Sequence, residues 1–91
     1  MPFSKFQPAI LTVDLPEEGL SAGDVGTVVD KHTAPGVLEI GYSVEFFDMT
    51  GGTVAVVTLA ESQLRAPTPA DRPSVRVLSE SEGNTSDASA R

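Results

Sequence analysis

The sequence predicts an all-β fold: a small five-stranded SH3-like barrel followed by a disordered polar tail. Short β-branched and aliphatic runs are separated by connections rich in glycine and proline, and no segment has convincing helical spacing. Only about 60 of the residues have a composition able to form a core, which suits a small barrel. Such a barrel, closed or nearly closed, would also remove exposed strand edges. An OB-fold is the alternative, although it usually needs a longer chain.

The first two strands are expected on either side of a glycine-rich loop. Residues 9–15 are mainly aliphatic and β-branched, and the Pro-Glu-Glu-Gly of residues 16–19 indicates a turn or exposed loop. The second strand is expected at residues 25–32. Glycine adopts the positive φ values that a tightly curled loop requires, and three glycines punctuate this one: Gly19, Gly23 and Gly26.

The clearest signal is the alternation in residues 38–46, where apolar side chains fall on even numbers and small or acidic ones on odd numbers. A period of two predicts a strand with one solvated face. Residues 48–52 predict a hairpin connection, and residues 53–59 predict its β-branched return strand. One helical or 3₁₀ turn is expected at 60–63, before a last short strand at 64–65.

The chain therefore divides into an N-terminal arm (1–8), the barrel (9–65) and a disordered polar tail (66–91). Prolines and a Ser-, Glu-, Asn- and Asp-rich end leave the tail without an apolar face. Its segment 73–78 contains an alternating apolar stretch that could add a strand to a partner's sheet or to the domain's own. In the arm, Phe3 and Phe6 are expected to cap the domain's own core, the alternative being a dimer contact.

Composition narrows the chemistry that is available to the chain. The absence of cysteine excludes disulfides, thiolate nucleophiles and cysteine-based zinc or iron–sulfur sites. The first six residues hold one lysine and no long apolar run follows, which predicts neither a secretory signal nor a membrane span. We therefore expect a cytoplasmic protein.

The charge balance favours a protein partner with a basic surface. Six Lys and Arg stand against 13 Asp and Glu, and a formal charge of −7 disfavours nucleic acid, because phosphate binding needs basic residues. Residues 1–65 are acidic themselves, with three basic residues (Lys5, Lys31, Arg65) against nine acidic ones: Asp14, Glu17, Glu18, Asp24, Asp30, Glu39, Glu45, Asp48 and Glu61.

Two groups of residues are candidates for partner binding. Glu17, Glu18 and Asp24, together with Asp30, surround one loop system and could attract a basic surface electrostatically. The alternative is a solvated loop that keeps the protein soluble.

The second group lies on the predicted hairpin. Glu45 and Asp48, with Glu39, share its outer face or rim, and Phe47 falls out of phase with the inward residues. Phe47 is therefore either outward and available to a partner or turned inward by a bulge.

Neither group predicts catalysis or a cofactor. Paired carboxylates perform acid–base chemistry where a cleft separates their pKa values, and no cleft is predicted. The spacing of Asp14, Asp24 and Asp48 lacks the dense alternation of a calcium loop, and His32 stands alone, so we predict no metal and no role for His32.

Several motifs are similar to those of a known family. They are Asp-Leu-Pro-Glu-Glu-Gly-Leu at 14–20, Gly-Asp-Val-Gly-Thr-Val-Val at 23–29, Val-Glu-Phe-Phe-Asp at 44–48, and Val-Thr-Leu at 57–59 with Leu-Arg at 64–65. Through them the stretch 10–65 resembles a bacterial family of short domains of unknown function with a predicted SH3-like barrel. The resemblance implies no established activity. It does imply a genetic setting beside other small uncharacterised genes, as in toxin–antitoxin or immunity pairs.

The sequence thus predicts a non-catalytic protein-interaction module, an antitoxin, immunity or accessory protein that binds a neighbouring gene product. A small accessory subunit or chaperone of a larger enzyme is one alternative. An RNA- or ribosome-associated module is the other, since residues 23–29 also resemble such SH3-like modules, although their loops are usually basic.

Overall fold

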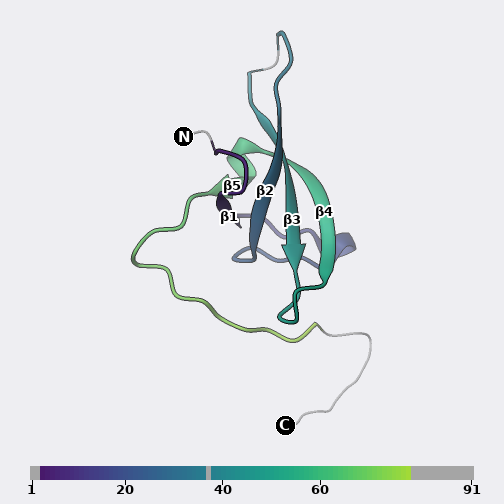
Figure 1. Ribbon diagram of the computed structural model, residues 1–91, viewed down its shortest axis with the longest axis vertical. Helices are drawn as coiled ribbons and strands as arrows, with labels where there is room; N and C mark the ends of the chain where they lie inside the picture. The colour runs from purple at the N-terminus through teal and green to yellow at the C-terminus, as the bar shows by residue number, and fades with distance from the viewer. Residues whose placement is uncertain (1–2, 37, 79–91) are drawn as a thin grey trace.

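The computed structural model describes residues 3–36 and 38–78, and these form one antiparallel sheet with almost no helix. Its strands are β1 (Pro8–Leu11), β2 (Val25–His32), β3 (Gly41–Phe47), β4 (Thr53–Ala60) and β5 (Leu64–Arg65). Two 3₁₀ turns, η1 (Pro16–Glu18) and η2 (Glu61–Gln63), precede β2 and β5. The strand order is β4-β3-β2-β1-β5 (Figure 1).

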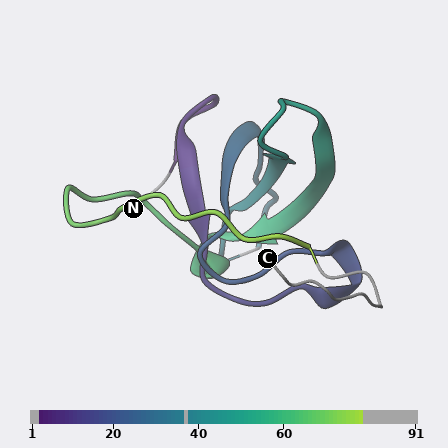
Figure 2. The same ribbon diagram turned by 90° about the horizontal axis from the view of Figure 1, so that it is seen from below.

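The sheet curls into a half-barrel, as the view from below shows (Figure 2). This confirms the predicted all-β, five-stranded class, while the assignment to SH3-like barrels stays a prediction. Because β4 and β5 end the strand order, β4 is an edge strand within the described part of the chain. The half-barrel therefore keeps an edge that a closed barrel would have lost.

Two strands are shorter than those that the sequence predicts, while β4 is one residue longer and ends at Ala60. β1 ends at Leu11, since the chain then leaves the sheet to form the β1–β2 loop. β3 begins only at Gly41, which pairs with His32 at the end of β2. Leu38 is 105% exposed and lies in the connection between them. The alternating pattern of residues 38–46 thus begins before β3 does, at positions where β2 no longer provides a partner.

The core forms where the alternating side chains of β3 meet β1 and β2. Tyr42, Val44 and Phe46 point inward and are buried with Leu11 and Val28, which confirms the even-numbered pattern.

Both aromatic residues of the N-terminal arm were predicted to cap the core, and one of them, Phe3, does so. The Phe3 ring packs edge-on against Tyr42, with ring centroids 5.3 Å apart, and the Phe3 N–H donates to the Tyr42 hydroxyl at 2.9 Å. Phe6 is 73% exposed and does not cap the core; its backbone has a positive φ of 67°, and its N–H pairs with the Val28 carbonyl.

The loop glycines serve two different purposes. Gly19 and Gly23 adopt φ values of 72° and 98°, as predicted. Gly26 lies in β2 without a positive φ, and instead allows a close approach: an added Cβ would lie 2.6 Å from Val44 Cγ1.

Candidate functional site

The β1–β2 loop presents its acidic residues at a defined tip. The 3₁₀ turn η1 begins with Pro16, and Gly19 ends it in the left-handed conformation. Leu15 and Leu20 close the base of the turn, each donating its N–H to the carbonyl of the other at 3.0 and 3.1 Å. This small closed turn leaves Glu17 and Glu18 exposed to solvent.

Two aspartates hold the rest of the loop. Asp24 Oδ2 accepts from the Ser21 N–H at 2.9 Å, and Asp14 Oδ1 accepts from the Ala22 N–H at 2.9 Å. Because these carboxylates satisfy loop amides, the loop does not need regular pairing to keep its shape.

Asp24 also binds an arginine from the tail. Arg76 Nη2 donates to Asp24 Oδ2 at 2.6 Å and to the Gly19 carbonyl at 3.1 Å, while Nε donates to Asp24 Oδ1 at 3.1 Å. Partial burial raises the pKa of Asp24, but hydrogen bonds from Arg76 and Ser21 outweigh it and the pKa lies below its ordinary value.

A groove of about 400 Å³ lies between η1 and the free edge of β4. Glu17 and Glu18 line it on the side of the loop, and Figure 1 shows η1 beside β4. The remaining lining consists of Leu15 and Gln63 with four successive residues of β4: Val56, Val57, Thr58 and Leu59. Two of the predicted loop acids thus border four residues of an edge strand.

The hairpin residues of the second predicted group have local partners. Asp48 Oδ1 accepts from the Thr50 N–H at 2.8 Å, the Thr50 hydroxyl at 2.7 Å and the Gly52 N–H at 2.9 Å. These hydrogen bonds, first of all that from the Thr50 hydroxyl, lower the pKa of Asp48. The Asp48 carboxylate therefore closes the β3–β4 turn.

The other two hairpin residues lie on the outer side of the sheet. Glu45 Oε2 accepts from the Thr53 hydroxyl at 2.6 Å. A bulge is present between Phe46 and Phe47, yet it leaves Phe47 45% exposed. Phe47 is accordingly available at the surface, as one of the two sequence interpretations required.

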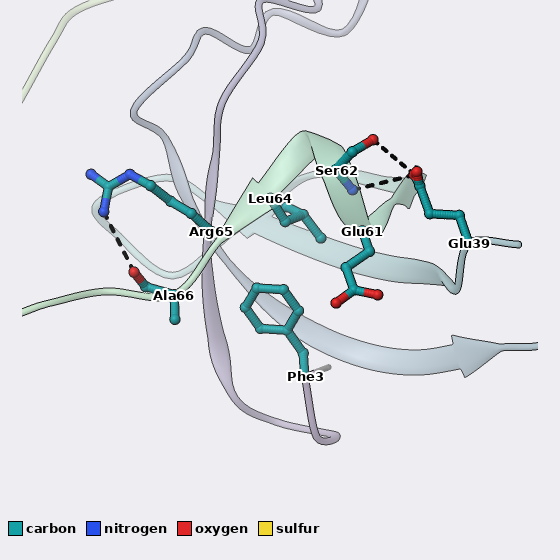
Figure 3. Close-up of a pocket in the computed structure, with 7 residues that line it drawn as sticks. All are labelled: Phe3, Glu39, Glu61, Ser62, Leu64, Arg65 and Ala66. Atoms are coloured by element: carbon teal, nitrogen blue, oxygen red, sulfur yellow. Dashed lines mark hydrogen bonds between the residues drawn. The ribbon is translucent and has the colours of Figure 1, made fainter. Parts of the chain in front are cut away.

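A second pocket, of about 480 Å³, lies at the other side of the sheet beside β5 (Figure 3). The buried residues Phe3 and Leu64 contribute apolar surface, and Glu39, Glu61, Ser62, Arg65 and Ala66 complete the lining. The Ser62 hydroxyl and N–H donate to Glu39 Oε1 at 2.8 and 3.4 Å. Sequence reasoning did not find this pocket, because Glu39 and Ser62 are 23 residues apart.

The structure separates two residues from the groups in which the sequence placed them. Asp30 lies on β2 five residues after Val25, at the end of the strand remote from the loop that holds Asp24. Glu39 bonds to Ser62 near η2, whereas Glu45 and Asp48 belong to the hairpin.

One polar pair was missed entirely. His32 Nε2 lies 2.7 Å from Ser43 Oγ across the β2–β3 ladder. The pair is exposed and lines neither of the two pockets described above. A cross-strand hydrogen bond accounts for it.

Within residues 3–36 and 38–78, no three His, Asp or Glu side chains gather in a way that could hold a metal ion. Of the helices in that same part of the chain, none is long and apolar enough to cross a membrane.

Comparison with known proteins identifies a family and no characterised relative. No curated protein and no solved structure matches the chain. Residues 6–66, which run from the arm through β5, match the family described as "Domain of unknown function (DUF4926)". The match contains the loop, the groove and all five strands, and the chain belongs to this family.

Proposed function

We propose that this protein is a non-catalytic interaction module that binds an extended, basic segment of a partner protein in the groove between η1 and β4. The observation that supports the proposal best is the combination of a free strand edge with two exposed glutamates beside it. In the cell, such a module serves as an antitoxin, immunity or accessory protein for the product of a neighbouring gene.

The edge strand is suited to accept another strand. β4 runs for eight residues, Thr53–Ala60, and contains neither a charged residue nor a proline. Natural proteins usually protect a long edge with lysine, proline or a covering element, because its unpaired N–H and C=O groups pair with any available strand. Val54 and Val56 are 47% and 56% exposed on the outer face of β4, where a partner's aliphatic side chains can pack.

The charges beside the edge favour a basic partner segment over a second copy of this chain. A second copy would bring its own Glu17 and Glu18, as well as a formal charge of −7, toward the same groove. Lysine or arginine side chains on the incoming strand would lie near Glu17 and Glu18 and accelerate association electrostatically.

Co-purification of the tagged full-length protein with the neighbouring gene product tests the proposal. We expect the wild-type protein to retain that product, and Glu18→Lys to weaken its binding at least fivefold by placing a positive charge at the groove. Asp30→Lys is the matched control, because Asp30 is exposed and remote from the groove. Failure of the wild-type protein to bind the product, or an equal effect of both substitutions, would contradict the proposal.

A further inference from the structure

The tail returns to the domain and contacts the acidic loop. After β5, residues 66–78 contain no helix or strand, yet they run back across the loop that joins β1 to β2 (Figure 2). Arg76 donates three hydrogen bonds there, to both carboxylate oxygens of Asp24 and to the Gly19 carbonyl. Leu78 Cδ1 also lies close to Gly19, 3.8 Å from the position that a Cβ would take.

The arrangement has the properties of a site for a guanidinium group. A fork of two N–H donors on one carboxylate is the geometry in which arginine binds acids most strongly, and the carbonyl adds a third acceptor in a defined direction. The acceptor side is held in place, since Asp24 Oδ2 also binds the Ser21 N–H and Gly19 follows the closed turn η1. Asp24 first, and Asp14 in addition, raise the pKa of Arg76.

A second ion pair turns the tail toward this site. Arg65, the last residue of β5, donates to both carboxylate oxygens of Asp71 at 2.7 and 2.9 Å. Asp71 Oδ2 also accepts from the N–H and the hydroxyl of Thr68, at 2.7 and 3.1 Å. The resulting turn lies between the end of the sheet and Arg76.

Charge is distributed so that the returning segment complements the domain. Residues 1–65 hold nine acidic and three basic residues, a formal charge of −6. Residues 66–78 hold Asp71 against Arg72 and Arg76, a formal charge of +1. The part of the chain that contacts the acidic loop is thus its basic part.

We infer that residues 73–78 are an intramolecular ligand that occupies a guanidinium-binding site formed by Asp24 and the Gly19 carbonyl, and that this site takes an arginine of the partner's extended segment. The inference rests on the proposed function, because Gly19 directly follows Glu18, which lines the groove beside β4. The ligand class is an arginine flanked by aliphatic residues, as in the chain's own Val75-Arg76-Val77. Partner binding then requires that the tail leave the site, so the full chain is partly autoinhibited.

The test uses the ¹⁵N-labelled full-length protein and one synthetic probe, a capped peptide with the sequence of residues 73–80. Chemical-shift titration of the Gly19 and Asp24 amides reports its binding. We expect Arg76→Gln to bind the peptide at least fivefold more tightly than the wild-type protein, whose own tail competes at high effective concentration. The double variant Asp24→Asn with Arg76→Gln should not bind it, nor should Arg76→Gln bind a peptide with glutamine in place of the arginine.

Arg72→Gln is the matched control. It removes a guanidinium four residues away that, among residues 3–36 and 38–78, donates only to the Pro69 and Asp71 carbonyls, so it should behave as the wild type. Equal affinities of the wild-type protein and Arg76→Gln, or the absence of peptide binding from both, would overturn the inference. Since no partner is used, the peptide titration tests the tail site independently of the co-purification experiment. A failure of co-purification alone rejects the proposed function, and with it the partner's arginine as a ligand, but leaves the site for the tail.

Discussion

Gly26 provides the sharpest test of how closely the curled sheet is packed. It lies on β2, opposite Ala9 on one side and Phe46 on the other. A Cβ at this position would lie 2.6 Å from Val44 Cγ1, 2.9 Å from the Glu45 carbonyl oxygen and 3.0 Å from Phe46 Cδ1. All three distances are shorter than ordinary van der Waals contact, and one of them involves backbone that cannot move alone.

Gly26→Ala should therefore lower the free energy of unfolding by about 1–3 kcal/mol, the usual cost of overpacking a core. A domain of this size has only about 3–5 kcal/mol in total, so the variant loses much of its stability. With an m-value of about 1 kcal/mol/M, the urea midpoint falls by roughly 1–3 M.

Two other glycines supply graded controls for urea denaturation. At Gly23 a Cβ meets nothing within 4 Å, but φ is 98°, so Gly23→Ala should cost about 1 kcal/mol from backbone strain alone. At Gly41 the nearest atoms lie 3.8 Å away and φ is not positive, so Gly41→Ala should change stability by less than about 1 kcal/mol. If Gly26→Ala were as stable as Gly41→Ala, the packing argument would be refuted.

Two further predictions concern exposed carboxylates. Asp48→Ala should accelerate hydrogen exchange at the Thr50 and Gly52 amides, because both lose their acceptor. Asp48→Asn should retain most of the protection. Equal exchange in both variants would contradict the role of Asp48 in capping the turn. Hydrogen bonds from Arg65 hold the pKa of Asp71 well below its ordinary 3.8. The stabilisation that this ion pair gives the folded state is therefore fully present above about pH 4. It is lost as the pH falls through the lowered pKa of Asp71 in the folded protein. Carboxyl-carbon NMR should show that Arg65→Gln returns the Asp71 pKa toward 3.8, and an unchanged titration would show that the pair does not form.

The fold could be predicted largely because its signals are local. The period-two pattern of Tyr42, Val44 and Phe46 requires a half-buried strand, and the bounds of β2 agree with the prediction. The limits of β1 and β3 could not be found in this way, because a strand ends where its neighbour ends, and the pairing of Gly41 with His32 is a property of the sheet.

The candidate site could be predicted only in part. Glu17, Glu18 and Asp24 lie on one loop and were grouped correctly by their nearness in sequence. Asp30 was grouped with them for the same reason, but an extended strand carries it about 3.3 Å further away with each residue. The groove between η1 and β4 joins residues about 40 positions apart, and no local pattern indicates such a contact.

In the tail segment 73–78, the charged residue forms the main contact with the domain, and the alternating apolar residues do not. Its alternation suggested an added strand, but residues 73–78 form no strand and contact the domain chiefly through the guanidinium of Arg76. Val75 and Val77 stay exposed, so the contact between the tail and the loop does not bury these apolar side chains. A tail held mainly by an exposed ion pair is released by salt or by a competing arginine at little free-energy cost. A tail whose valines were packed into the core would not be released so easily. The Asp24–Arg76 contact is therefore suited to cover the acidic loop reversibly.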